Sequence, residues 1–482
     1  MNSKKFLLLF LLIIILGASL YSFHFLKTDR TYGDENIHSW QIQQFLSGDF
    51  KLHPNLTTLP GYHYAIYFFS KIFGTTSIFG MRYITFAFGI LAVLIFYFCA
   101  KFVSPNNANA KTLQFFFLPI LFQYFFLIYT DVASLFLVLL ALFFALKKQN
   151  IISFIIIFLS LFIRQTNIIW LLFIFVAIFV REYQNNNLPQ PLPASPAGRL
   201  RKEGNKKGLA SATKAYTKFP PRTLGSTNIK GHPATVILSV ARRIPLLIRE
   251  ILHFVQDDKN NNWAVLSKGV LNHCKKNFIY IAGIIAFIIF TFFNKGFALG
   301  DKEMHPWFSF HMGNIYIALI AFFFLFLPLN IYNFKKIVAF IKKKPIVLGF
   351  LFILFFIYIF TSSYTHHYNE ERYIFYIKNV LLFFLNKYTV VRLLFFLPIA
   401  YSILSLMVTK LHEKWQYLIY PATILMLLPS SLIEHRYYII PFSLFILFKQ
   451  KQPKWVEYSQ ITIFIATSLG IIFGLSQEKF FF

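Results

Sequence analysis

The first apolar run of the chain is FLLLFLLIIILGASLYSFHF (residues 6–25), which is close to the length that crosses a bilayer. Two further runs, FGILAVLIFYFCAKF (88–102) and IYIAGIIAFIIFTFF (279–293), have the same character. Of the 482 residues, 57% are hydrophobic and only 13% are charged, whereas about a quarter of a soluble domain is charged. The sequence therefore predicts an all-α fold, a polytopic transmembrane helical bundle with about 12–14 spans.

The charges of the chain predict how these spans are oriented. The predicted spans lie near 6–26, 80–102, 113–130, 132–147, 150–163, 168–181, 277–293, 313–333, 345–363, 390–409, 415–430, 437–449 and 457–475. With the N-terminus in the cytoplasm, the basic clusters between the spans all fall on the cytoplasmic side, as the positive-inside rule expects. This topology requires residues 373–384 to lie in the interface or to re-enter the membrane rather than cross it. It accounts for the net charge of +29 without a nucleic-acid partner, which we exclude.

One segment departs from the membrane pattern and divides the chain into three predicted parts. Residues 188–262 are basic and hold 8 of the 20 prolines, a composition typical of disorder. We predict a disordered cytoplasmic insertion there. An N-terminal transmembrane catalytic module (1–187), whose first extracytoplasmic loop is 27–79, would precede it, and a C-terminal transmembrane module (263–482) would follow.

The polar stretches that are not simply basic form a second pattern. They are GDENIH (33–38), LTTLPGYH (56–63), YTD (129–131), RQTN (164–167), GDKEMHPW (300–307), THHYNEERY (365–373) and LIEHRYY (432–438). In the predicted topology each one lies at the extracytoplasmic end of a span. A transporter would be expected to place such groups near the bilayer midplane. The one-sided arrangement is more typical of an active site at the membrane surface.

Two adjacent acids, Asp34 and Glu35, stand out because the chain has only 18 Asp and Glu against 47 Lys and Arg. A single acid after a span is most simply a solvated loop residue. The stretch GDENIHSWQIQQFL, however, has the spacing of an interfacial helix. Asp34 would then lie at the helix N-terminus, where a carboxylate is favoured, and His38 would share its face one turn on.

Sugar transfer from a lipid-linked phosphate would use this set of residues. A carboxylate takes the proton of the attacking hydroxyl, and Asp34 or Glu35 could do so. Cations stabilise the leaving phosphate, and aromatic rings hold sugars. The candidates for these two roles are Arg164, Lys302, Arg372, Arg436 and the histidines, and Trp40, Tyr62, Trp307, Tyr373 and Tyr437. No metal-ligand spacing is apparent, so no metal site is predicted.

These stretches, in this order, resemble the α-1,2-glucosyltransferase family that adds the terminal glucose to the lipid-linked oligosaccharide of N-glycosylation. The matching pieces are DENIHSWQIQQFLSGDF with TTLPG, YTD, FIRQTNIIW (162–170), GDKEMH, HHYNEERYIFYI and LIEHRYYIIPF (432–442). The resemblance covers nearly the whole chain except about 188–262. It implies an inverting membrane glycosyltransferase of the GT-C superfamily. The donor would be dolichyl- or polyprenyl-phosphate glucose, or another hexose, the acceptor a lipid-linked glycan, and no cofactor is expected.

The resemblance also implies roles for particular residues. Asp34 becomes the catalytic base, with Glu35 the neighbour that could replace it. The residues expected to contact the donor phosphate and sugars are His38, Arg164, Gln165, Asn167, Asp301, Lys302, His305, Arg372, Tyr373, Glu434, Arg436 and Tyr437. HHYNEERY departs from the family's usual sequence before the arginine, which leaves the roles of His366 and His367 open.

The resemblance leaves the cellular membrane and the activity itself open. The insertion and the Phe- and Ile-rich spans suggest a distant relative, so the membrane is either the endoplasmic reticulum or a bacterial inner membrane, with the active face extracytoplasmic. A transporter or flippase of lipid-linked sugar is the alternative of another class, and a degenerate, inactive member is a third. The sequence does not indicate whether the protein has protein partners.

Overall fold

The computed structural model describes residues 3–27, 29–187, 263–305, 310–362, 364 and 366–481. Within these ranges the chain is helical and has no β-strand, only two isolated β-bridges, so the all-α prediction is confirmed. Contacts divide the chain into a unit of residues 1–181 and 270–482 and a second unit of 182–269. The site described below lies wholly in the first unit. The predicted insertion at 188–262 lies outside the described residues.

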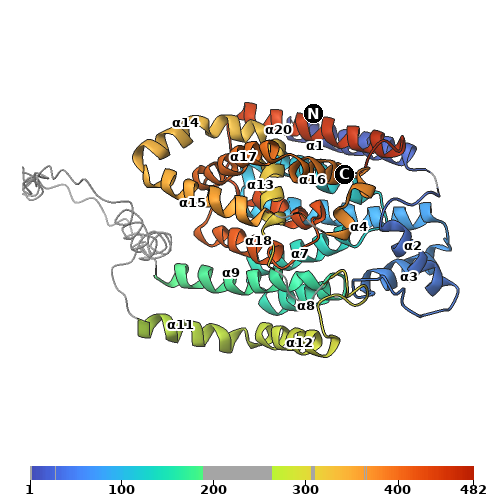
Figure 1. Ribbon diagram of the computed structural model, residues 1–482. Coiled ribbons are helices and arrows are strands. Elements are labelled where there is room, and N and C mark those ends of the chain that lie inside the picture. Colours follow the sequence, from blue (N-terminus) through green and yellow to red (C-terminus); the bar gives the residue numbers. More distant parts are fainter. Residues whose placement is uncertain are drawn as a thin grey trace, which may run out of the picture. The chain divides into compact units, whose positions relative to one another are not determined.

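The helices run side by side between two ends of the first unit, with α2 and α3 on the right in Figure 1. The α-helices before residue 188 are α1 (Ser3–Phe25), α2 (Glu35–Leu46), α3 (Gly61–Phe73), α4 (Ile78–Val103), α5 (Ala108–Phe116), α6 (Pro119–Phe122), α7 (Thr130–Leu146), α8 (Asn150–Leu161) and α9 (Ile168–Asn187). Those after residue 262 are α11 (Trp263–Lys276), α12 (Phe278–Asn294), α13 (Gly313–Leu325), α14 (Leu327–Lys343), α15 (Ile346–Thr361), α16 (Ile377–Lys387), α17 (Thr389–Val408), α18 (Ile419–Leu427), α19 (Ile439–Phe448) and α20 (Lys454–Ser476). The short 3₁₀ helices are η1 (Pro105–Asn107), η2 (Gln123–Phe125), η3 (Gln165–Asn167), η4 (His367–Asn369), η5 (Glu371–Tyr373), η6 (Lys414–Leu418) and η7 (His435–Tyr438).

Several helices are long and apolar enough to cross a membrane. The 26 residues of α4 extend about 39 Å at 1.5 Å per residue, more than the hydrocarbon thickness of about 30 Å. By length and composition, four helices of the described chain qualify, or up to seven if each of three bent helix pairs counts as one span. This confirms a polytopic membrane protein. The number is smaller than the expected 12–14 because hydropathy alone also counts short helices, such as the 12-residue α8.

The predicted span at 113–130 is not one continuous helix. It breaks into α5, α6 and η2, and α6 begins at Pro119, which has no N–H to continue the preceding helix. Every residue from 115 to 130 is buried. Irregular backbone is tolerated at membrane depth only where protein surrounds it, and here the rest of the bundle does so.

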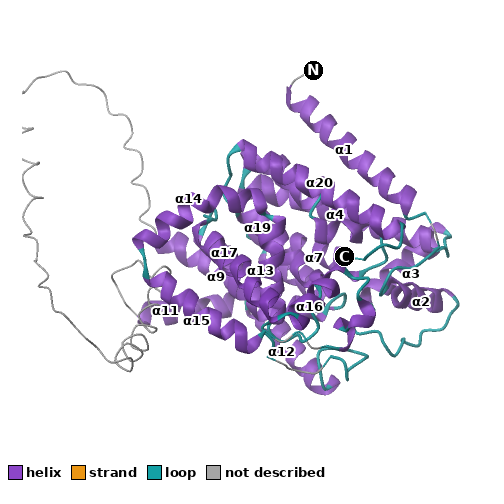
Figure 2. Cartoon of the chain, turned by 45° about the horizontal axis from the view of Figure 1, so that its top comes forward, coloured by secondary structure: helices purple, strands orange, loops and turns teal. Residues whose placement is uncertain are grey.

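Part of the segment 373–384 lies in α16, which begins at residue 377. The 11 residues of α16 span about 16 Å, less than the hydrocarbon thickness of a bilayer. Its first residue, Ile377, bonds to Phe481 beyond the end of α20 (2.8 Å), and α17 begins two residues after α16 ends. Figure 2 shows many of the loops gathered around α2, α3, α12 and α16, the same end of the unit.

A buried ionic cluster ties the helix ends together at the opposite, basic end of the unit. Glu457, in the first turn of α20, accepts bonds from Lys449 (3.2 Å) and Asn107 (3.1 Å). Gln114 donates to the same carboxylate at 2.5 Å, and the backbone N–H of Gln452 at 3.0 Å. The side chains of Glu457 and Lys449 are only 4% and 1% exposed, so each needs the other to offset its desolvation.

Replacing this carboxylate tests the cluster. We expect Glu457→Gln to lower the free energy of unfolding by about 3–5 kcal/mol, because it leaves Lys449 buried without its counter-ion. Thermal unfolding of the purified protein in detergent measures the effect. The matched control is Glu478→Gln, whose partner Arg30 and own side chain are about half exposed, and which should change stability by less than about 1 kcal/mol. Equal losses in both variants would contradict the role of the cluster.

Candidate active site

Asp34 lies at the N-terminus of α2, as the sequence predicts, but its side chain makes no capping hydrogen bond. Its Oδ2 instead accepts a bond from Nη2 of Arg436, at 2.7 Å. The Asp34 side chain is 48% exposed, whereas that of Arg436 is 14% exposed. The pair therefore joins a buried cation to a carboxylate that solvent, or a substrate, can reach.

Arg436 belongs to a row of alternating charges. Its Nε donates to Glu434 Oε2 at 3.0 Å, and the other oxygen of Glu434 accepts a bond from Lys378. The guanidinium also lies 5.3 Å from the centre of the Tyr129 ring, within the range of a cation–π contact. Lys378 and Glu434 are 8% and 11% exposed. The row Asp34–Arg436–Glu434–Lys378 thus has only one well-exposed member, Asp34.

The positive charges of this row set the protonation of Asp34. Burial among protein atoms raises the pKa of Asp34, while Arg436, and to a smaller extent His38 and Lys378, lower it. Because about half of the side chain is exposed, desolvation is partial, and the pKa lies below its usual value of 3.8. Asp34 is therefore ionised at neutral pH, the form that a general base requires.

Glu35 has a different environment from its neighbour Asp34. Its carboxylate is fully buried and binds Arg82, with Nε at 2.8 Å and Nη2 at 2.7 Å. It also accepts the backbone N–H groups of Tyr32 (3.1 Å) and Ile128 (2.9 Å). Arg82 in turn donates to the carbonyl oxygens of Leu26 and Arg30. The Glu35–Arg82 pair thus holds the chain between α1 and α2, and no lone pair of Glu35 faces a substrate.

Another ion pair lies close to the Asp34–Arg436 pair. Arg164, just after α8, binds Asp131 in the first turn of α7. Asp131 is 2% exposed, and its second oxygen has no hydrogen-bond partner within the described residues. Burial lowers the pKa of Arg436, but the negative charges of Asp34 and Asp131 together raise it above its usual value. The two ion pairs therefore share one electrostatic environment.

The charges of both ion pairs act on His38. Burial lowers its pKa to about 4, and it senses the charges of Asp34, Arg436, Asp131 and Arg164. Its Nδ1 lies 2.9 Å from Nε2 of His63 on α3. His38 is therefore neutral at pH 7 and can donate or accept a hydrogen bond without adding charge to the site.

Loops from the second half of the chain approach the same place. The backbone N–H groups of Leu299 and Gly300 bond to Thr57 and Leu56 in the first loop, each at 2.9 Å. The next residue, Asp301, accepts a bond from the Tyr368 hydroxyl (3.0 Å) and lies 3.8 Å from His305. Burial lowers the pKa of His305, and the charges of Asp34 and Arg436 also act on it. Asp301 and His305 therefore belong to the site.

The other predicted residues lie apart from the row of charges or are engaged elsewhere. Gln165 donates to the Thr57 carbonyl, and Asn167 is buried against Ser134 and Ser160. Lys302 binds Asn294, and Arg372 is 51% exposed beside Glu370 and His367.

The aromatic residues predicted to hold sugars have different surroundings in the structure. Tyr373 packs under Arg372 (5.1 Å), and Tyr437 lies next to Arg436 and packs partly on the core. Tyr62 is buried with its hydroxyl on Thr85 (2.7 Å), whereas Trp40 is 39% exposed. Trp307 lies outside the described residues.

Sequence reasoning did not assign Lys378, Asp131 and Arg82, and it included His63 only among the histidines of the polar stretches. Lys378 and Arg82 are single charges inside apolar runs, a signal that usually marks a buried partner. Asp131 lies in the YTD stretch, which the sequence singles out without giving Asp131 a role. Only the structure shows which charges face each other.

Two further features concern possible ligands. Within the described residues, no group of three or more His, Cys, Asp or Glu is arranged to hold a metal ion.

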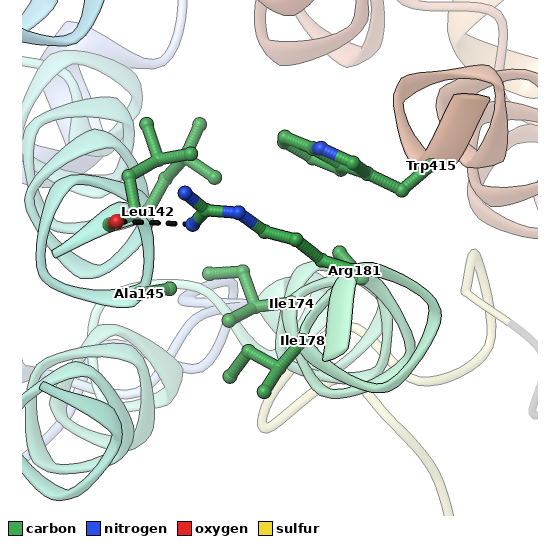
Figure 3. Close-up of a pocket in the computed structure, with 8 residues that line it drawn as sticks. Leu142, Ala145, Ile174, Ile178, Arg181 and Trp415 are labelled. Carbon is green, nitrogen blue, oxygen red and sulfur yellow. Dashed lines mark hydrogen bonds between the residues drawn. The ribbon is translucent and has the colours of Figure 1, made fainter. Parts of the chain in front are cut away.

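A small pocket lined by Leu142, Ala145, Ile174, Ile178, Arg181 and Trp415 is shown in Figure 3. It lies toward the far end of α7 from Asp131, since Ala145 is about 21 Å away from Asp131 along the helix axis. It is therefore not part of the candidate site.

The fold and the site define a multi-pass membrane protein with paired carboxylates and cations at one end of its helices. The chain matches the DIE2/ALG10 family, a family of glycosyltransferases, over residues 28–447, and so belongs to it. A relative in Arabidopsis thaliana, the Dol-P-Glc:Glc(2)Man(9)GlcNAc(2)-PP-Dol alpha-1,2-glucosyltransferase, is 27% identical over 453 residues, covering 86% of this chain and 85% of that protein. No solved structure matches the chain.

The different environments of the two adjacent acids are testable through stability. We expect Glu35→Gln to lower the free energy of unfolding by about 3–5 kcal/mol, because Arg82 would remain buried without its counter-ion. Asp34→Asn should cost less than about 1 kcal/mol, since the carboxylate is half exposed. Thermal unfolding in detergent compares the two. A larger loss for Asp34→Asn than for Glu35→Gln would reverse the assignment.

Proposed function

We propose that this chain is an inverting α-1,2-glucosyltransferase that transfers glucose from a dolichyl- or polyprenyl-phosphate carrier to a lipid-linked glycan. The observation that carries the proposal is the Asp34–Arg436 pair, which puts an exposed carboxylate 2.7 Å from a buried guanidinium. Family membership and the activity named for the Arabidopsis relative support the donor and acceptor classes. The comparisons give no support to a transporter.

The proposed reaction assigns a task to each end of this pair. Asp34 takes the proton of the acceptor hydroxyl as its oxygen forms a bond to the anomeric carbon of glucose. The bond between that carbon and the phosphate oxygen breaks on the opposite face, and the lipid phosphate leaves with the electron pair. Arg436 stabilises the charge on the departing phosphate, and Lys378 adds a second positive charge behind Glu434. Attack from the face opposite the leaving phosphate inverts the configuration at the anomeric carbon.

The same pair couples donor binding to the strength of the base. Without donor, Arg436 keeps the pKa of Asp34 low, and a carboxylate with a low pKa is a weak base. A phosphate bound to Arg436 shares the guanidinium with Asp34 and adds a negative charge nearby, and both effects raise the pKa of Asp34. Asp34 thus becomes a better base when the donor is in place.

The membrane environment completes the proposal. The apolar helices would hold the lipid tails of donor and acceptor, so both reach the site from within the bilayer. The basic clusters at the other end of the unit support a cytoplasmic orientation for that end, and hence an extracytoplasmic active face. Glu35, through Arg82, and Gln165, through Thr57, shape the first loop rather than contact the substrate.

Removing the proposed base should abolish transfer. We expect Asp34→Asn to reduce the rate by at least about 100-fold, since a general base typically contributes roughly 10²–10⁴-fold. The assay incubates purified protein with radiolabelled dolichyl-phosphate glucose and a lipid-linked glycan, and scores the new glycosidic bond. Asp49→Asn, an exposed acid of the same first loop, is the control and should stay active. Wild-type activity in Asp34→Asn would rule out this residue as the base.

Removing the proposed phosphate ligand should weaken use of the donor. We expect Arg436→Ala to lower kcat/KM for the donor about 10- to 100-fold, because a charge-assisted hydrogen bond contributes about 1.5–3 kcal/mol. Arg181→Ala, at the far end of the helices, provides the matched control (Figure 3). A donor dependence that is the same in Arg436→Ala and wild type would count against a phosphate at this position.

A further inference from the structure

Two histidines form a buried pair directly behind the candidate base. His38 on α2 is 7% exposed and His63 on α3 is fully buried. His38 Nδ1 and His63 Nε2 are 2.9 Å apart, so one ring donates to the other. Asp34 and His38 lie one turn apart, because His38 N–H bonds to the Asp34 carbonyl at 3.1 Å. The direction of the hydrogen bond between the two rings therefore decides whether the other ring nitrogen of His38, which is free within the described part of the chain to meet a ligand, carries a proton.

Both rings are neutral at pH 7, so each carries a single N–H proton. Burial lowers the pKa of His63 well below 6.5, and the adjacent His38 lowers it further. Burial likewise lowers the pKa of His38 to about 4. In a neutral imidazole, one nitrogen donates and the other accepts. Two arrangements of the pair are then possible.

The surroundings of His63 select one arrangement. His63 Nδ1 is enclosed and has no hydrogen-bond partner in the described part of the chain. If His38 donated to His63, the proton of His63 would lie on this Nδ1 as a buried donor without an acceptor. Among buried backbone groups, N–H groups without partners are rarer than under-satisfied carbonyl oxygens, and we apply the same preference to this ring. His63 Nε2 is therefore the donor, and His38 Nδ1 is the acceptor.

The proton of His38 then lies on its other nitrogen, Nε2. This atom makes no hydrogen bond to the described residues and, unlike His63 Nδ1, is not fully enclosed. The charged groups that act on the ring come from four parts of the fold: Asp34 before α2, Asp131 on α7, Arg164 before η3 and Arg436 on η7. The rings of Tyr62 and Tyr129 pack edge-on against it.

We propose that His63 is a positioning residue that fixes the tautomer of His38, so that His38 Nε2–H donates a hydrogen bond to an oxygen of the donor phosphate. The inference rests on the proposed function and adds a ligand to it. The donor phosphate is the expected partner because Arg436, its proposed ligand, is among the charged groups that act on the ring. Because the His38 ring is neutral, its N–H can bond to the phosphate without competing with Arg436 and Arg164 for the carboxylates of Asp34 and Asp131.

A double-mutant cycle separates positioning from packing, using wild type, His63→Leu, His38→Gln and the double variant. The readout is kcat/KM for dolichyl-phosphate glucose in the transfer assay, with KM for the acceptor measured in parallel. The side-chain amide that His38→Gln introduces supplies an N–H near the position of Nε2 and needs no tautomer. We therefore expect His63→Leu to lose about tenfold in the wild-type background and less than about twofold in the His38→Gln background.

Two results of this cycle would contradict the role of His63 or the phosphate as ligand. The same loss from His63→Leu in both backgrounds would mean that His63 only packs, and would overturn it. A loss confined to the acceptor KM would overturn the phosphate as ligand. Should His63→Leu fail to fold, the cycle is run with His63→Asn, whose amide is too short to reach His38 but keeps a polar group. Wild-type protein that forms no glycosidic bond would instead refute the proposed function.

Discussion

The buried Glu35–Arg82 pair is the interaction on which the candidate site depends. Arg82 lies in the first turns of α4, and through Glu35 it reaches the chain before α2 and the backbone at Ile128. Two charges that are fully enclosed must satisfy one another, so this pair fixes where the first loop meets the bundle. Asp34, one residue earlier, is thereby directed away from the core. Of the two adjacent acids, Glu35 therefore stabilises the fold, whereas Asp34 remains at the surface.

The Asp34–Arg436 contact then joins residues 402 positions apart in the chain. The first loop also pairs through its backbone with residues 299–301, so segments from both halves of the sequence surround one place. A site assembled from such distant segments needs every one of them in register.

Much of this arrangement follows from the sequence, and the limits have physical reasons. Apolar runs predict the helices because a membrane span must be long and apolar, and the spacing after Asp34 predicts α2. The run at 113–130 is misleading because a broken segment enclosed by protein is as apolar as a span. The one-sided polar stretches predict the site region, whereas the partners of each charge do not follow from them. Asp34 and Glu35 have the same chemistry, and only Arg82 and Arg436 distinguish them.

The balance of charges around Asp34 has a consequence for how ligands arrive. The carboxylates are Asp34, Asp131 and Glu434, and the cations are Arg164, Lys378 and Arg436. Every positive charge is already matched by a negative one, so the site projects little net field into the surrounding water and does not attract anions over long distances. A ligand held in the bilayer needs no such attraction, because two-dimensional diffusion brings it to the protein. Selection then occurs at contact, where a phosphate must replace one carboxylate oxygen, and soluble anions gain no advantage from the arginines.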